Sequence, residues 1–91
     1  MLNWYKKRLE EMRQPIAVII LQRLDRSGKY LGLDELIRVT GQNRGMILQG
    51  LKYLHGKGLI QSNTGKWNAI KASSGASTFG ITAEGKNVLR A

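Results

Sequence analysis

The sequence predicts a small α+β domain that is mostly α-helical, with three helices in the core and a small antiparallel sheet at its edge. Its 91 residues are the length of one domain. Apolar residues recur at helical spacing through the first half of the chain, which is the pattern of amphipathic helices. The second half has short alternating apolar segments separated by glycine and serine, which is typical of strands and turns.

Two helices are expected at the start of the chain. The first is residues 2–12, where one helical face carries Leu2, Tyr5, Leu9 and Met12. Pro15 suits the first turn of a second helix, because the N–H that proline lacks has no partner there. This helix, residues 16–26, is apolar on more than one side, so we expect it to be the central helix of the core. Gly28 is expected to end it.

After a short extended piece at residues 29–31, two further helices are expected, joined by a tight turn at Gly41. The first is residues 33–40 and buries Leu33, Leu36 and Ile37. Asn43 is suited to cap the second, because its side-chain oxygen can accept a free backbone N–H. This second helix runs to about residue 55 and buries Ile47, Leu51 and Leu54. Gly50 shares that face, where its small size allows a neighbouring helix to approach closely.

A hairpin and a last helix are expected in the remainder of the chain. Residues 59–62 are the first predicted strand, and residues 78–82 are the second, with Phe79 and Ile81 on one face. The glycine- and serine-rich residues 64–77 are expected to form a loop, in which residues 67–70 are the candidate for an additional strand. Thr82 is suited to cap the final helix, with Val88 and Leu89 facing inward.

Net charge indicates the class of partner. The chain carries a formal charge of +9 and has a pI near 10.4, an excess that favours nucleic acid or an acidic membrane surface. No carboxylate occurs between Glu35 and Glu84. The basic residues in that interval are Arg38, Arg44, Lys52, Lys57, Lys66 and Lys71.

Several motifs between residues 33 and 61 carry a family resemblance. They are an L-x-E-L helix at Leu33, a turn glycine at Gly41, a capping residue at Asn43, spaced aliphatic residues and the sequence KGLI. Together with FGITAEGKNVL near the end, they resemble winged-helix regulators of the MarR, ArsR and PadR type over about residues 16–90. The resemblance implies a winged helix: a helix-turn-helix, a β-hairpin wing, and extra N- and C-terminal helices. It also implies a regulator of transcription that binds double-stranded DNA.

The helix after Gly41 is the candidate recognition helix. If Ile47, Leu51 and Leu54 face inward, the polar residues between them face outward, at a width that fits the major groove. Gln49 can pair with adenine, Arg44 can address guanine or a phosphate, and Lys52 can hold phosphate. The candidate residues of this helix are Asn43, Arg44, Gly45, Gln49 and Lys52. The alternative is that they form an ordinary solvated helix face.

The expected wing, about residues 59–82, lies along the DNA backbone or enters a minor groove, and it supplies the second set of candidate DNA contacts together with flanking basic residues. These residues are Arg38, Lys57, Lys66, Trp67 and Lys71. Trp67 has two interpretations: it stacks on unpaired bases, or it packs at the base of the wing.

The sequence leaves two questions open, one about assembly and one about function. The apolar stripe of residues 2–12 either pairs with a second copy in a homodimer or covers the central helix of its own chain. The helix after Gly41 also carries Met46, Leu48 and Tyr53, so the alternative function is a protein-interaction adaptor with non-specific affinity for nucleic acid. Binding of structured RNA is a third option.

Enzymatic chemistry is not expected. The chain lacks cysteine, its lone His55 cannot form a metal site by itself, and no nucleophile arrangement or phosphate loop occurs. We therefore expect no cofactor and no metal. No apolar run is long enough to span a bilayer and the N-terminus lacks a signal-peptide pattern, so the expected location is the cytoplasm, with the nucleoid when bound to DNA. The expected organisation is an N-terminal helix at residues 1–13 and a winged-helix domain at residues 14–91.

Overall fold

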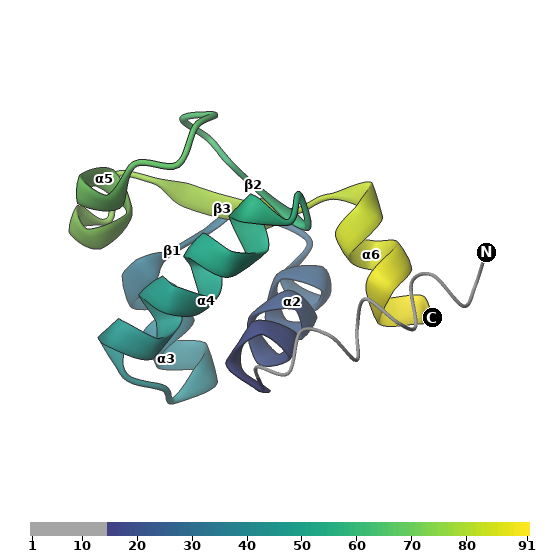
Figure 1. Ribbon diagram of the computed structural model, residues 1–91. Helices are drawn as coiled ribbons and strands as arrows, with labels where there is room; N and C mark the ends of the chain where they lie inside the picture. The colour runs from purple at the N-terminus through teal and green to yellow at the C-terminus, as the bar shows by residue number, and fades with distance from the viewer. Residues whose placement is uncertain (1–14) are drawn as a thin grey trace.

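The computed structural model describes residues 15–91, a mostly helical α+β arrangement with five helices and a three-stranded antiparallel sheet (Figure 1). The expected N-terminal helix, with Leu2, Tyr5, Leu9 and Met12, lies outside the described residues. The elements are α2 (Pro15–Ser27), β1 (Leu31–Gly32), α3 (Leu33–Thr40), α4 (Arg44–Gly56), β2 (Ile60–Ser62), α5 (Ala69–Ser74), β3 (Thr78–Ile81) and α6 (Ala83–Arg90). Within residues 15–91, none of the helices combines the length and apolar character that a membrane crossing needs.

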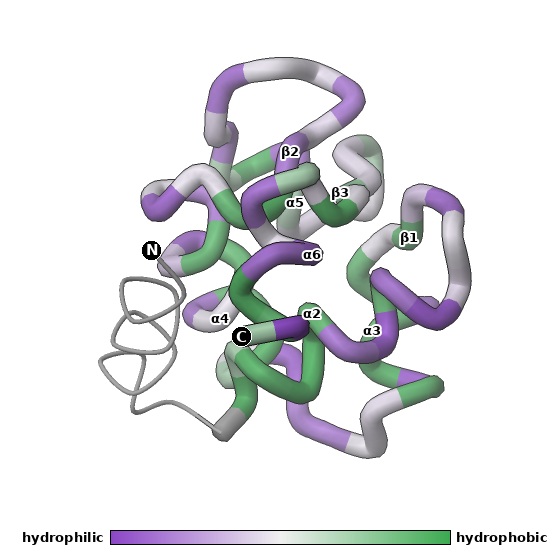
Figure 2. Tube along the Cα trace, turned by 90° about the vertical axis from the view of Figure 1, so that its right-hand side faces the viewer, coloured by the Kyte–Doolittle hydropathy of each residue, from purple (hydrophilic) through white to green (hydrophobic). Residues whose placement is uncertain are grey.

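Helix α2 is the centre of the core, as its apolar sequence predicted. It contacts α3, α4, α6 and β3, and Figure 2 shows its hydrophobic turns between α3 and α4. Its fully buried side chains are Ala17, Ile20, Leu21 and Leu24. The helix ends before Gly28, which has the positive φ of 65° that glycine adopts without strain.

Helix α4 packs on α2 through the buried face that the sequence predicted. Ile47, Leu51 and Leu54 are fully buried on this face. A Cβ atom at Gly50 would lie 2.7 Å from Cδ1 of Ile20 and 3.5 Å from Cγ1 of Ile16. The expected close approach of a neighbouring helix is therefore confirmed, and α2 is that helix.

The turn between α3 and α4 has the predicted chemistry. Gly41 has φ of 70°, and its N–H donates to the carbonyl of Ile37 at 2.9 Å. Asn43 caps α4, since its Oδ1 accepts from the N–H of Met46 at 2.9 Å. These two contacts fix the direction in which α4 leaves the turn. Ile37 itself is half-buried rather than fully buried.

The sheet has the order β1-β3-β2, with both pairings antiparallel. Phe79 in the central strand faces Leu31 of β1 and Ser62 of β2, and its side chain is buried in the core. Gly80 points to the opposite face, where the Tyr30 ring covers it so closely that a Cβ atom would lie 2.7 Å from Cε1 of that ring. The predicted strand alternation, with Phe79 and Ile81 toward the core, is confirmed.

The structure corrects the expectation for residues 64–77. No strand forms at residues 67–70; the helix α5 lies there instead, at residues Ala69–Ser74. Asn68 caps it by accepting from the N–H of Lys71 at 2.9 Å, and Gly75 ends it with φ of 86°. These two residues are ordinary helix boundary signals, but the glycine- and serine-rich surroundings obscured the short segment between them.

Candidate nucleic-acid interface

The outward face of α4 carries polar side chains that no described segment covers. Gln49 and Lys52 are exposed, as is Gly45 in the first turn of the helix. A shallow groove runs along this face and is lined by Gln49, Lys52, Tyr53, Gly56 and Lys57. The ammonium group of Lys57 lies 5.7 Å from the centre of the Tyr53 ring. The face thus combines a hydrogen-bonding amide with two ammonium groups.

Arg44 joins this face to α5. The residue is exposed, yet one guanidinium nitrogen, Nη2, donates to the carbonyl of Ser73 and to the Ser73 hydroxyl, the latter at 2.9 Å. A guanidinium has five N–H donors in all, so the group can hold α5 and still present other donors to an anion. The sequence did not indicate this link, because Ser73 lies 29 positions further along the chain.

Asn43 and Gly45 shape the first turn of α4. The Asn43 side-chain oxygen is engaged in the helix cap, so its amide nitrogen is the group that remains for an outward contact. A Cβ atom at Gly45 would lie 3.6 Å from that same oxygen, which is an ordinary contact. Packing against residues 15–91 therefore does not require glycine at this position, and its absent side chain leaves the backbone open to a close ligand.

Trp67 packs at the base of the segment between β2 and β3. It is half-buried, and its ring centre lies 5.9 Å from that of Phe79 and 5.9 Å from that of His55. His55 is held in turn by a hydrogen bond between Nε2 and the Gly65 carbonyl, at 3.0 Å. The packing interpretation of Trp67 is confirmed, and the ring anchors the segment to α4 and the sheet.

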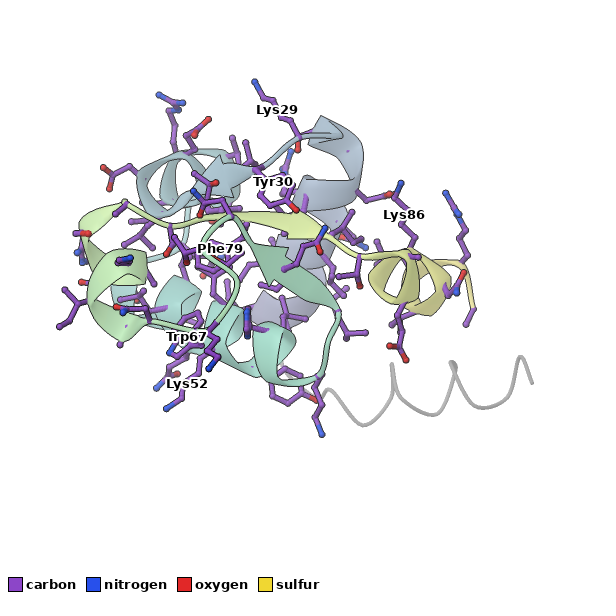
Figure 3. All side chains as sticks on the ribbon, turned by 90° about the horizontal axis from the view of Figure 1, so that it is seen from above. Lys29, Tyr30, Lys52, Trp67, Phe79 and Lys86 are labelled. Atoms are coloured by element: carbon purple, nitrogen blue, oxygen red, sulfur yellow. The ribbon has the colours of Figure 1, made fainter. Side chains whose placement is uncertain are left out.

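Exposed basic side chains surround these elements. Lys66 precedes Trp67, Lys71 lies on α5, and Arg38 lies on the last turn of α3. Viewed from above, Lys52 and Trp67 lie on one side of the molecule, and Lys29 and Tyr30 on the other (Figure 3). The stretch from Leu36 to Ala83 contains no carboxylate that would neutralise these cations.

The three apolar residues proposed as an adaptor surface, Met46, Leu48 and Tyr53, are not equally exposed to solvent. Met46 is 42% exposed, whereas Leu48 and Tyr53 are half-buried and pack against the core. A larger apolar exposure occurs at Ile70 on α5, at 80%. The sequence pattern did not single out Ile70, because no helix was expected there.

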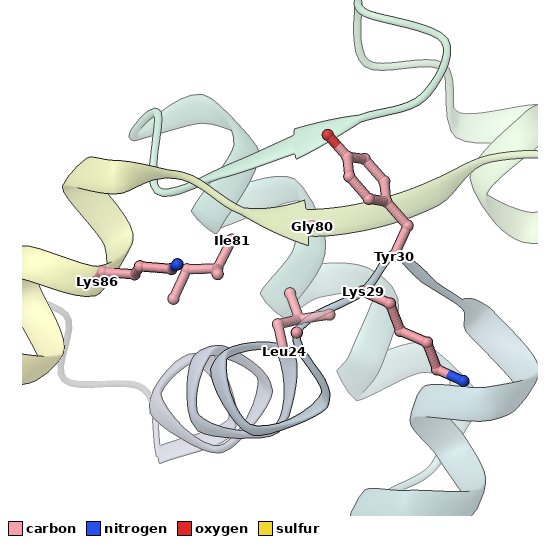
Figure 4. A pocket seen from close by; sticks show the side chains of 7 residues that line it. Leu24, Lys29, Tyr30, Gly80, Ile81 and Lys86 are labelled. Carbon is pink, nitrogen blue, oxygen red and sulfur yellow. The ribbon is translucent and has the colours of Figure 1, made fainter.

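A second hollow lies near the end of α2. Leu24 and Ile81 form its apolar part, Tyr30 stands over Gly80 beside it, and Lys29 and Lys86 complete its rim (Figure 4). No group of His, Asp or Glu side chains in residues 15–91 is arranged to hold a metal ion.

Comparison with protein-family models, with curated proteins and with solved structures gives no match.

Proposed function

We propose that the chain is a winged-helix protein that binds duplex DNA and regulates transcription. The order of its elements supports this, because α2, α3 and α4 form a three-helix core with a tight turn before α4. In this assignment α4 is the recognition helix, and the segment between β2 and β3 is the wing. Strand β1 pairs with β3 and is an outer strand of the small sheet.

The proposed contacts to DNA come from the outward face of α4 and from the segment between β2 and β3. An α-helix fits the major groove, where the residues near its start reach base edges. The Gln49 amide can form two hydrogen bonds with one adenine, and such a bidentate contact is worth about 1–3 kcal/mol of discrimination against other bases. Lys52, Lys66 and Lys71 are suited to hold phosphates, which fix the register of the protein without reading sequence.

The observation that carries the proposal is the open polar face of α4 within a stretch of sequence, residues 36–83, that lacks carboxylates. Gln49 and Lys52 are both exposed on it. Were this face merely solvated, acidic residues would be expected among the basic ones, since ordinary surfaces mix both signs.

The test is selection of bound sequences from a random duplex pool at physiological salt, followed by binding measurements on variants. We expect Gln49→Ala to relax the preference at one or two base positions. Lys66→Ala is the matched control: it should weaken binding to all sequences alike and reduce the slope of log affinity against log salt by about 0.9. An unchanged preference in Gln49→Ala would show that α4 does not read bases in this orientation.

A protein-interaction adaptor is the second candidate, favoured by the 42% exposure of Met46 on α4. It predicts that the same selection enriches no sequence, although the basic surface retains weak affinity for any duplex. Enrichment of one sequence motif would therefore decide against it.

A further inference from the structure

Ile70 is far more exposed than the other large apolar side chains of the described chain. It is 80% exposed, against 38–42% for Val39, Tyr30 and Met46. A single exposed apolar residue is common on protein surfaces, so exposure alone assigns no role. Its position in a rigidly held, basic part of the molecule is what distinguishes it.

Helix α5, which carries Ile70, is fixed to the rest of the molecule from several directions. Ala72 is fully buried, and Ser73 accepts hydrogen bonds from Arg44 of α4. The carbonyl of Lys71 accepts from the N–H of Ser77 at 3.0 Å. Where the segment meets the sheet, the Thr64 hydroxyl lies 2.8 Å from that of Ser62 and 3.3 Å from that of Ser77. The short helix therefore provides stiff support for any group that it exposes.

Helix geometry sets the direction of Ile70. Ala72 lies two positions further along, a step that turns an α-helix by about 200°, so Ile70 is on the side opposite the buried face. Ser73 lies three positions further along, and residues at that spacing share a side. Ile70 thus lies on the outer side of α5, next to the side that contacts the start of α4.

Charge selects the kind of surface that this side chain meets. Lys71 is its neighbour on α5 and Lys66 precedes the helix, both exposed. Their cations attract a polyanion, and an apolar side chain that lies between them in the sequence needs an apolar place within that polyanion. Stacked base pairs, reached through the minor groove, provide such a place.

We propose that α5 is a wedge, in which Ile70 enters the minor groove, partly unstacks one base step and bends the duplex. This inference rests on the proposed function, since α4 in the major groove carries the attached α5 to the flanking strand and the next minor groove. Aliphatic wedges of this kind bend DNA by about 20–90°, and the contacts that the bend adds offset the cost of unstacking.

The test is ligase-catalysed closure of a linear duplex of about 120 base pairs, which is shorter than the DNA persistence length of about 150 base pairs. We expect the intact protein to raise the closure rate by about tenfold or more, because a duplex that is already bent needs less elastic energy to close. Ile70→Ala should remove most of this increase, whereas Ile70→Leu should keep it. Val39→Ala, which shortens another exposed aliphatic side chain on a helix, is the matched control and should behave as the intact protein.

Three measurements made alongside separate the outcomes. The melting temperature of Ile70→Ala should be unchanged or higher, because alanine is the better helix former. If the intact protein retards a duplex that carries the selected sequence more strongly than a scrambled duplex of equal length, but does not accelerate closure, the wedge is wrong and the proposed function stands. If it does not prefer the selected duplex, the proposed function itself fails. An altered sedimentation coefficient in Ile70→Ala would assign the side chain to a contact between copies and overturn the wedge.

Discussion

Gly85 marks the closest approach between α6 and the sheet. A Cβ atom there would lie 2.2 Å from the Leu59 carbonyl oxygen and 2.7 Å from Cγ1 of Ile81. The Thr82 hydroxyl accepts from the N–H of Gly85 at 3.1 Å and donates to the Gly58 carbonyl at 2.8 Å. The start of α6 is therefore tied to the chain just before β2, and a backbone atom cannot move aside as a flexible side chain does.

We expect Gly85→Ala to destabilise the fold by about 2 kcal/mol or more, since overpacking of a core contact costs about 1–3 kcal/mol. In a domain of this size each 1 kcal/mol lowers the melting temperature by roughly 4–8 °C. Gly56→Ala at the end of α4 is the matched control, because a Cβ atom there meets nothing within 4 Å. Thermal unfolding followed by circular dichroism measures both, and equal melting temperatures would contradict the close contact at Gly85.

At the level of elements, α5 depends on its neighbours. A helix of six residues is not stable alone in water. It persists here because Ala72 is buried, Asn68 and Gly75 bound it, and Arg44 reaches Ser73 from α4. The Arg44–Ser73 hydrogen bonds matter for the proposed wedge, since they hold α5 in place against α4 when Ile70 contacts DNA.

Arg44→Met tests the link. The substitution keeps the aliphatic stem and removes the donors, so α5 should lose about 1 kcal/mol of local stability, the usual net worth of a hydrogen bond. Its amide protons, above all that of Ala72, should then exchange roughly fivefold faster. Arg38→Met on α3 is the control with the same chemical change, and exchange in α5 should be unaffected by it. Unchanged exchange in Arg44→Met would show that the other contacts hold α5 alone.

Across the whole molecule, basic residues outnumber acidic ones, and no carboxylate occurs between Glu35 and Glu84. The charge of +9 on 91 residues opposes self-association by repulsion. A dimer of this chain would therefore need apolar contact to offset that repulsion. The apolar stripe of residues 2–12 is the segment proposed to provide it.

We predict that the intact chain sediments as a homodimer and that a chain beginning at Gln14 sediments as a monomer. The physical reason is that an amphipathic helix of this length requires a partner to be stable in water. A two-fold dimer would also engage two half-sites about one helical turn apart. If the shortened chain also sediments as a dimer, the stripe is not the main dimer contact.

Local chemistry was sufficient for the helices that carry the proposed interface. The turn at Gly41, the cap at Asn43 and the buried side of α4 depend on residues within a few positions of one another, so the sequence predicted them correctly. The close contact at Gly50 was predictable because glycine weakens a helix interior, and on an apolar face close packing offsets that cost. With that face buried, Gln49 and Lys52 necessarily point outward.

Helices α2, α3, α4 and α6, the alternation in β3 and the sign of the charge were predictable from the sequence, because each depends on near neighbours or on composition. The helix α5, the packing of Trp67 between His55 and Phe79, and the hydrogen bonds from Arg44 to Ser73 became apparent in the folded structure alone. Those features join residues far apart in the chain, and their stability comes from burial and hydrogen bonds that exist once the core has formed.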